Sequence, residues 1–278
     1  FKDNLAGTGG ALNIRALSDF EIFGCIFYEN KANVIPGSSE AGWGGAISYV
    51  DGTSSPFERK ITNSLFVRNS SITSEPSLYS AIFTPVPLEI NNCVFWANEN
   101  NGSIGHGYAM KKEGSNATAE FISQGTRANN IFHGWIDDSQ AISANPLFED
   151  IDDPDGPDNQ WFSSDDGLRL KNNSPAIDFG STQSLPSDLR DMDSDGKTNE
   201  PIPLDITNTE RILGQEADLG PYEFKNNYFA SKTRSVKVQD GLILYFSFDE
   251  TSGISVIDRS GNNRNASLVN ISEADLAA

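Results

Sequence analysis

The chain of 278 residues is poor in cysteine, histidine and basic side chains. It has two cysteines and two histidines, and 20 Lys and Arg residues stand against 39 Asp and Glu residues, which gives a formal net charge of −19. A nucleic-acid ligand needs basic side chains that replace the counterions of its phosphates, so this balance argues strongly against nucleic acid and against anionic membranes. With only two His and two Cys residues, few combinations are available for a Ser-His-Asp or Cys-His catalytic set.

Long apolar runs are missing as well. No window approaches the roughly eighteen continuous apolar residues that a membrane-spanning helix needs, so we expect no membrane span. No signal peptide opens the chain, which begins at Phe1 inside a repeat. We therefore interpret it as a mature or excised part of a longer secreted protein. The apolar fraction of 37% together with 24 glycines is typical of a globular chain and not of a disordered one.

The sequence does contain a repeated motif, Phe-x-x-Asn. Four copies begin at Phe1, Phe27, Phe66 and Phe95. A fifth copy, around Phe132, keeps the apolar part but has Trp135 at the Asn position. The Phe-to-Phe spacings are 26, 39, 29 and 37 residues. A fixed motif at irregular spacing is typical of a stacked solenoid in which the loops vary and the rungs do not.

The residues around each motif predict short strands. An apolar-alternating run precedes each Phe, and a start of small residues such as Gly-Gly-Ala-Ile at 44–47 follows after a loop. We therefore predict an all-β fold, a parallel β-helix, with the Phe residues in an interior column and the Asn residues in a hydrogen-bonded ladder. A β-propeller would need steadier spacing, and a β-sandwich would not keep one motif in register five times.

The two cysteines test this architecture. Cys25 and Cys93 occupy the same column of the repeat, with Ser64 between them. Rungs about 4.8 Å apart would separate the pair by roughly 9–10 Å. A disulfide needs Cα atoms within about 7 Å. We expect both to be free, buried thiols.

Two resemblances cover the first 224 residues. The Phe-x-x-Asn and Gly-Gly-Ala-Ile repeats of about 1–135 resemble right-handed parallel β-helix proteins of the pectate-lyase-like type and the repeats of polymorphic outer-membrane proteins. Four motifs then follow in order, Asn-Pro-Leu-Phe at 145–148, Asp-Gly-Leu-Arg-Leu at 166–170, Ser-Pro-Ala-Ile-Asp-Phe-Gly at 174–180 and Ala-Asp-Leu-Gly-Pro-Tyr-Glu-Phe at 217–224. This succession resembles the choice-of-anchor region of large bacterial surface β-helices. It implies a domain over 1–224 in which 145–224 form capping coils.

In such a cap, two apolar pairs would form the final rungs and seal the open end of the solenoid. These pairs are Leu168 with Leu170 and Ala176 with Ile177.

A third resemblance lies at the end of the chain. Gly-Leu-Ile-Leu-Tyr-Phe-Ser-Phe-Asp-Glu at 241–250 and Asp-Arg-Ser-Gly-Asn at 258–262 resemble the opening strands of a laminin-G-like, concanavalin-type jelly roll, a class that often binds glycans. A jelly roll has about eight strands, so 241–278 would hold only an incomplete N-terminal hairpin. The polar residues 225–240 would be the linker.

Two acidic loops are candidate calcium sites, because calcium takes six to eight oxygen ligands and suits Asp-rich loops. The first loop, 191–202, matches the first half of a calcium-binding loop, with Asp at positions one, three and five and Gly at position six. At position twelve, where such a loop has a bidentate Glu, this chain has Ile202. The predicted ligands of the first loop are Asp191, Asp193, Asp195 and Glu200. The second loop offers Asp152, Asp153, Asp155 and Asp158. The alternative for both is a solvated acidic loop.

Aromatic side chains on variable loops offer stacking surfaces for sugar rings. Trp43 and Tyr108 are the predicted carbohydrate-binding residues, and the alternative is that they cover the flanks of the solenoid. No residue is assigned a catalytic role.

Two functions remain at this point. The first is a secreted or cell-surface structural or adhesive β-helix, bacterial in type, calcium-stabilised and associated with a polysaccharide or cell-surface glycan. The second is the C-terminal part of a β-helical polysaccharide lyase or glycoside hydrolase whose catalytic coils lie upstream. Residues 1–135 contain no ordered basic or paired-acid set, which favours the first. The open ends of a solenoid also allow head-to-tail self-association.

Overall fold

The computed structural model describes residues 1–15, 19–37, 42–49, 58–73, 80–84, 88–104, 127–133, 141–225, 255–256 and 266–267. The chain divides into two compact units, Phe1–Phe224 and Lys225–Ala278. The described residues form short strands and loops, with one short 3-10 helix, η1 (Thr182–Ser184). Among these residues, none of the helical structure has the length and apolarity to cross a bilayer.

The described residues of the first unit form four sheets whose strands recur from one repeat to the next. The central sheet consists of β4 (Ile26–Tyr28), β8 (Leu65–Val67), β12 (Val94–Trp96), β16 (Asn130–Phe132) and β17 (Ala141–Ile142). The sheet that precedes it in each repeat consists of β3 (Phe20–Phe23), β7 (Arg59–Thr62), β11 (Glu89–Asn91) and β15 (Arg127–Ala128).

The other two sheets follow the central strand in each repeat. One consists of β1 (Leu5–Ala6), β5 (Lys31–Asn33), β9 (Ser70–Ile72), β13 (Glu99–Asn100) and β14 (Ser103–Ile104). The other consists of β2 (Leu12–Ile14), β6 (Ile47–Tyr49) and β10 (Ile82–Phe83). We call one set of consecutive strands, such as β3, β4 and β5, a rung.

Pairing between rungs is parallel and keeps the repeat in register. In the central sheet Ile26 pairs with Leu65, and Leu65 pairs with Val94. Antiparallel pairing of named strands is confined, in the described residues, to β13 with β14 and to β18 (Ser255–Val256) with β19 (Ala266–Ser267). The predicted all-β class is confirmed, and these parallel sheets are compatible with a β-helix-like fold.

Sharp turns flank each central strand at fixed positions of the repeat. The residue three before each motif Phe has a left-handed backbone, with φ of 62° at Gly24, 48° at Asn63, 54° at Asn92 and 55° at Asn129. Two residues after the Phe the backbone is left-handed again, with φ of 54° at Glu29, 56° at Arg68 and 54° at Ala97. Asn tolerates this conformation better than most residues, which accounts for its recurrence at the first turn.

The motif phenylalanines form one continuous stack, as predicted. Ring centroids are 4.9 Å apart for Phe1 and Phe27, 4.8 Å for Phe27 and Phe66, 4.5 Å for Phe66 and Phe95, and 4.9 Å for Phe95 and Phe132. The stack is the axis of an interior core that also contains Ile47, Ile61, Ile82 and Ile90. The column of equivalent residues inferred from the sequence therefore exists.

The motif asparagines form the predicted ladder beside this stack. Asn30 donates from its side-chain Nδ2 (2.9 Å) and its backbone N (3.1 Å) to Oδ1 of Asn69. Asn69 donates in the same way to Oδ1 of Asn98, at 3.0 and 2.9 Å. Each Nδ2 also donates to a phenylalanine carbonyl of the preceding rung, for example Asn69 to Phe27 at 2.9 Å. In each of these rungs a single Asn side chain therefore provides hydrogen-bond partners for the buried backbone N–H and C=O groups at this turn.

The cysteine column confirms the prediction of free thiols. Cys25 and Cys93 are not bonded; Cys93 is buried as predicted, whereas Cys25 is only half-buried. Backbone N–H groups donate along this column, from Cys25 to Ser64 Oγ (3.1 Å), from Ser64 to Cys93 Sγ (3.4 Å) and from Cys93 to Asn130 Oδ1 (2.8 Å). Burial raises the pKa of the Cys93 thiol to about 12. The column therefore takes small side chains that can accept a hydrogen bond.

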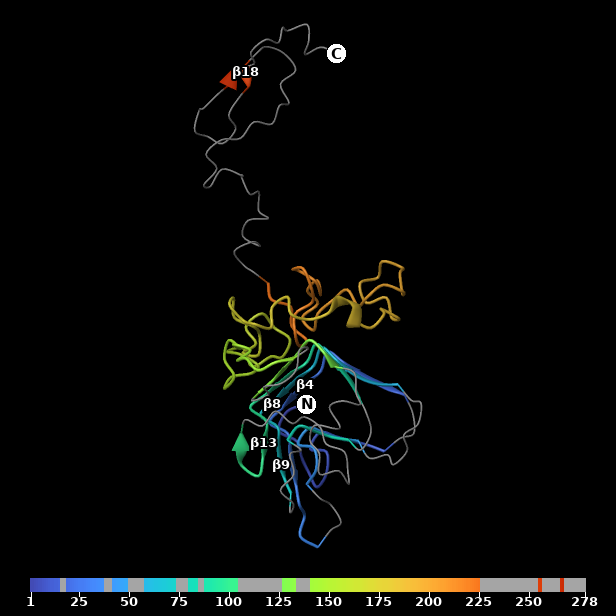
Figure 1. Ribbon diagram of the computed structural model, residues 1–278, viewed down its shortest axis with the longest axis vertical. Helices are drawn as coiled ribbons and strands as arrows, with labels where there is room; N and C mark the ends of the chain where they lie inside the picture. The colour runs from blue at the N-terminus through green and yellow to red at the C-terminus, as the bar shows by residue number, and fades with distance from the viewer. Residues whose placement is uncertain are drawn as a thin grey trace. The chain divides into compact units, whose positions relative to one another are not determined.

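Residues 145–224, which we call the cover, differ from the prediction. They were expected to add final rungs at an end of the stack, but none of the named strands lies among them. Instead the cover packs on the outward face of the central sheet (Figure 1). Leu168, Leu170 and Ala176 lie in a second apolar core with central-sheet residues of successive rungs, and Ile177 packs against it. The members from the sheet are Ile26, Tyr28, Leu65, Val67, Val94 and Ile131.

The physical reason lies in the central strands. Ile26-Phe27-Tyr28 and Leu65-Phe66-Val67 are buried at every position, as parallel strands covered on both faces are. The Phe residues point into the interior core, so the residues on either side of them need a second apolar layer. The cover supplies that layer.

Polar contacts fasten the cover along both edges of the central sheet. At the turn before the strand, Nδ2 of Asn63, Asn92 and Asn129 donates to carbonyls of Asp218 (3.2 Å), Ser181 (2.9 Å) and Phe179 (2.6 Å), respectively. At the other edge, Tyr28 Oη donates to the Ile151 carbonyl at 2.8 Å, and Arg68 forms an ion pair with Asp152. The asparagines of the first turn therefore serve both the turn and the docking of the cover.

The second unit is described at Lys225 and at the four residues of two short strands. β18 (Ser255–Val256) pairs with β19 (Ala266–Ser267) in antiparallel register. The residues of 241–250 and 258–262, on which the jelly-roll resemblance rests, and the predicted linker after Lys225 lie outside the described residues. The incomplete jelly roll over 241–278 stays a prediction.

The ladder predicts the result of one pair of substitutions. Asn69→Ala would leave the donors of Asn30 and the carbonyl of Phe27 without this partner in a buried setting, where each unpaired group costs about 1–3 kcal/mol. We expect Asn69→Ala to lower the free energy of unfolding by more than about 2 kcal/mol in urea titrations. Asn4→Ala, at the exposed first position of the ladder, is the matched control and should cost clearly less. Equal losses for the two variants would contradict the ladder.

Candidate functional site

The first predicted calcium loop is a closed excursion from the cover. Its base is held by an antiparallel bridge between Ser187 and Pro201 and by a hydrogen bond from Ile202 N to the Pro186 carbonyl at 2.9 Å. Within it, Asp191 has a left-handed backbone with φ of 52° and accepts the Gly196 N–H with both carboxylate oxygens, at 3.1 and 3.2 Å. The Asp-x-Asp-x-Asp-Gly sequence thus folds into a tight acidic turn.

The four predicted ligands lie in two overlapping groups. One consists of Asp193, Asp195 and Glu200, and the other of Asp191, Asp193 and a residue that the sequence reasoning missed, Asp188. In each group one carboxylate oxygen of every member lies within 4.8 Å of the others. Two ligands of an ion about 2.4 Å away are at most about 4.8 Å apart, so either spacing suits calcium.

The sequence offered only one signal for Asp188, an acidic residue three positions before Asp191, and its burial does not follow from that spacing. The calcium-loop pattern has Asp at positions one, three and five and begins here at Asp191, so Asp188, which precedes it, was not included.

A lysine distinguishes the two groups. Lys197 Nζ pairs with Asp195 and lies 3.7 Å from Glu200. Hydrogen bonds from Lys197 lower the pKa of Asp195, and the same contact raises the pKa of Lys197. In the described part of the chain, no Lys or Arg forms an ion pair with Asp188, Asp191 or Asp193. The group with Asp188 therefore carries uncompensated negative charge.

The second acidic loop is arranged differently. Asp152 pairs with Arg68, and Asp155 pairs with Lys2 at 3.4 Å. Asp153 is half-buried and Asp158 is exposed. Among the described residues, these four do not form a group of three carboxylates with oxygens as close as those of the first loop. The charges of Asp152 and Asp155 are used to hold the cover to the first rungs, and a metal at this loop stays a prediction.

The predicted sugar-binding aromatics are only partly visible. Trp43 is half-buried, and its ring stacks on Phe83 with centroids 4.4 Å apart, so one face is already in protein contact. Tyr108 lies outside the described residues.

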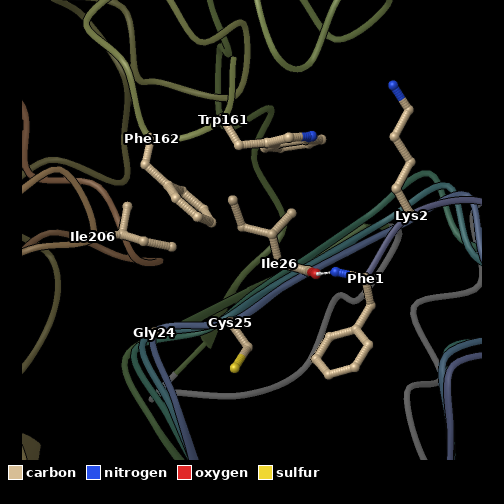
Figure 2. A pocket seen from close by; sticks show the side chains of 8 residues that line it. All are labelled: Phe1, Lys2, Gly24, Cys25, Ile26, Trp161, Phe162 and Ile206. Carbon is tan, nitrogen blue, oxygen red and sulfur yellow. Dashed lines mark hydrogen bonds between the residues drawn. The ribbon is translucent and has the colours of Figure 1, made fainter. Parts of the chain in front are cut away.

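A pocket of about 330 Å³ opens where the cover meets the first rungs (Figure 2). Ile26 points toward Trp161 and Phe162, whereas the Phe1 ring points to the opposite side of the sheet (Figure 2). Phe162 is 51% exposed. Lys2 Nζ lies 5.7 Å from the centre of the Trp161 ring. The position of this aromatic lining was not predicted, because nothing in the sequence indicated that 161–162 would lie beside the start of the chain.

A buried ionic cluster closes the cover. Arg211 donates to Glu223 Oε2 at 2.6 Å and to the carbonyls of Asp218 (2.8 Å) and Gly220 (2.9 Å). Burial raises the pKa of Asp218 and of Glu223 and lowers that of Arg211, since each charge has left water. Both carboxylates also accept backbone N–H groups, from Phe224 (2.6 Å) and Leu213 (3.1 Å). These contacts make the cluster a structural centre for residues 205–224.

Comparison with protein-family models, with curated proteins and with solved structures gave no match for this chain.

Removal of Arg211 tests the structural role of the ionic cluster. Arg211→Met leaves Glu223 buried without its partner, and loss of one member of a buried pair costs about 3–5 kcal/mol. We expect a loss of that size in the free energy of unfolding. Lys60→Met removes a pair in which the Lys60 side chain is 35% exposed and lies 3.0 Å from Glu58, and it should change the unfolding midpoint little. An Arg211→Met protein as stable as the parent would show that the cluster contributes nothing to the cover.

Proposed function

We propose that the first unit is a right-handed parallel β-helix that serves as a structural and adhesive part of a secreted or cell-surface protein. The observations that support this most directly are the continuous stack of Phe side chains from Phe1 to Phe132 and the Asn ladder from Asn4 to Asn98, which join neighbouring rungs in the same way. Such repetition gives a rigid scaffold whose stability comes from nearest-neighbour contacts. The parallel pairing of every rung is consistent with this topology.

The use of buried charges also favours a structural role over hydrolysis or elimination. Asp166 is buried, where it accepts the Tyr222 hydroxyl at 2.5 Å and the Phe162 N–H at 2.7 Å. Arg211 and Glu223 pair with each other. A glycoside hydrolase needs two carboxylates free to face the scissile bond. Among the described residues, these buried groups are instead committed to contacts within the fold.

Calcium is the proposed stabilising ion. The loop of Asp191, Asp193, Asp195 and Glu200 brings carboxylates together at spacings that fit a hard cation, within a chain of net charge −19. Bound calcium would remove repulsion among these groups and would hold the loop to the cover. It would act as a structural ion and not as a catalyst.

A polysaccharide or cell-surface glycan is the proposed partner. Trp43 and Tyr108 are the residues proposed from the sequence, and the pocket beside Trp161 adds a second aromatic surface. Aromatic faces stack on the apolar faces of sugar rings, and the negative charge of the chain favours a neutral glycan over an acidic one.

The calcium proposal predicts a shift in thermal stability. Treatment with EDTA should lower Tm, and added calcium should restore it, because an ion that binds only the folded state stabilises it by mass action. Differential scanning fluorimetry of the full chain measures this, with magnesium at equal ionic strength as the control. An unchanged melting curve would remove calcium from the proposal.

The glycan proposal predicts slower migration of the chain in native gels that contain a neutral polysaccharide such as xylan or a β-glucan. Trp43→Ala and Trp161→Ala should each be tested, and at least one should restore free migration. Leu189→Ala changes a residue that is 80% exposed outside both surfaces and is the matched control. Free migration of the unaltered chain in every polysaccharide tested would refute the association.

A further inference from the structure

The acidic loop contains one feature that the calcium-loop pattern does not explain. Asp188 is only 1% exposed, although Asp is rarely buried without partners. Its Oδ2 accepts the Met192 N–H at 2.7 Å, but its buried Oδ1 has no hydrogen-bond partner among the described residues. An unpaired buried carboxylate oxygen is costly, because it has lost its water without gaining a donor.

We infer that Asp188, Asp191 and Asp193 are the carboxylate ligands of a single divalent-cation site, and that Asp195 and Glu200 are not. The inference deepens the proposed calcium stabilisation and rests on it. It replaces the ligand set expected from the sequence by moving the ion to the group that contains the buried oxygen of Asp188.

Charge compensation separates the two groups. Lys197 Nζ already neutralises Asp195 and lies 3.7 Å from Glu200, so a cation there would have to displace an ammonium group. Asp188, Asp191 and Asp193 have three carboxylates with oxygens within 4.8 Å and no basic partner in the described part of the chain. Three negative charges that close together repel one another, and a divalent ion is the group that relieves them.

Backbone hydrogen bonds of the chain itself close the loop. Asp188 N donates to the Glu200 carbonyl at 2.8 Å, and Asp191 N donates to the Asp188 carbonyl at 3.2 Å. These backbone contacts hold two of the three ligands at fixed positions, which lowers the ordering cost of binding. Calcium takes six to eight oxygens, so carbonyls and water would complete its coordination.

The position of the loop gives the ion a structural consequence. Met192 follows Asp191 directly and lines a pocket of about 180 Å³ together with Phe23 and Gly24 of the first rungs and Ile206 of the cover. Fixing Asp191 and Asp193 would fix Met192 between them. The ion would thereby secure one edge of the cover against the stack.

Calcium titration of the full chain by isothermal calorimetry tests the assignment. The unaltered chain should bind one ion at this loop. Asp188→Asn and Asp191→Asn should each weaken binding by at least about tenfold, because each removes a ligand charge from the site. Asp195→Asn and Glu200→Gln, which change carboxylates of the same loop outside the proposed site, should keep the parent affinity to within about threefold.

Circular dichroism without calcium checks that Asp188→Asn is folded. Asp191→Asn changes a residue that is less buried, and it tests the site even where Asp188→Asn does not fold.

Three results would overturn the inference in different ways. Binding that survives Asp188→Asn and Asp191→Asn but is lost in Glu200→Gln would place the ion in the other group, with calcium stabilisation intact. Equal loss in all four variants would mean one ion shared by both groups. No binding by the unaltered chain would remove both the site and the calcium proposal.

Discussion

The first unit depends on one constraint, which is that equivalent buried side chains of neighbouring rungs must lie directly over each other. The Phe rings stack at 4.5–4.9 Å, and each Asn of the ladder serves the rung beside it. A short strand of three residues, such as β8 (Leu65–Val67), cannot be stable alone. It persists because its backbone, its Phe and its Asn turn all find partners above and below. The loops between strands can vary because they take no part in this register.

The columns could be predicted from the sequence because they depend on local pattern alone. Phe-x-x-Asn recurs with the same offset to its turns, so Phe66, Asn69 and the Cys93 column followed from alignment of the repeats. Thiol bonding was excluded correctly because the distance between two rungs is set by the sheet and not by the loops. The Phe and Asn columns and the unbonded cysteines each concern equivalent positions of neighbouring repeats, so the alignment of the repeats is sufficient to predict them.

The cover could not be placed in this way, although one signal was present. Ile26-Phe27-Tyr28 and Leu65-Phe66-Val67 do not alternate between apolar and polar residues, and such runs indicate strands buried on both faces. The predicted Phe, Asn and Cys columns gave no place to the residues on either side of each Phe, and the apolar residues of 145–224 were assigned to further rungs. The same limit applied to the acidic loop, since the burial of Asp188 depends on how the cover folds and not on the spacing of the Asp residues.

The Asn ladder has one more property, which is direction. Within the ladder, Nδ2 of Asn30 donates to Asn69 and Nδ2 of Asn69 donates to Asn98, so each Asn–Asn hydrogen bond runs toward the higher-numbered rung, and Oδ1 of Asn69 and of Asn98 accepts from the lower-numbered one. The amide dipoles therefore add along the stack, and hydrogen bonds in such a chain polarise one another. The two ends of the stack are electrically unlike. Two copies that met in the same orientation could extend the line of dipoles, whereas two copies that met by identical ends would set those dipoles against each other.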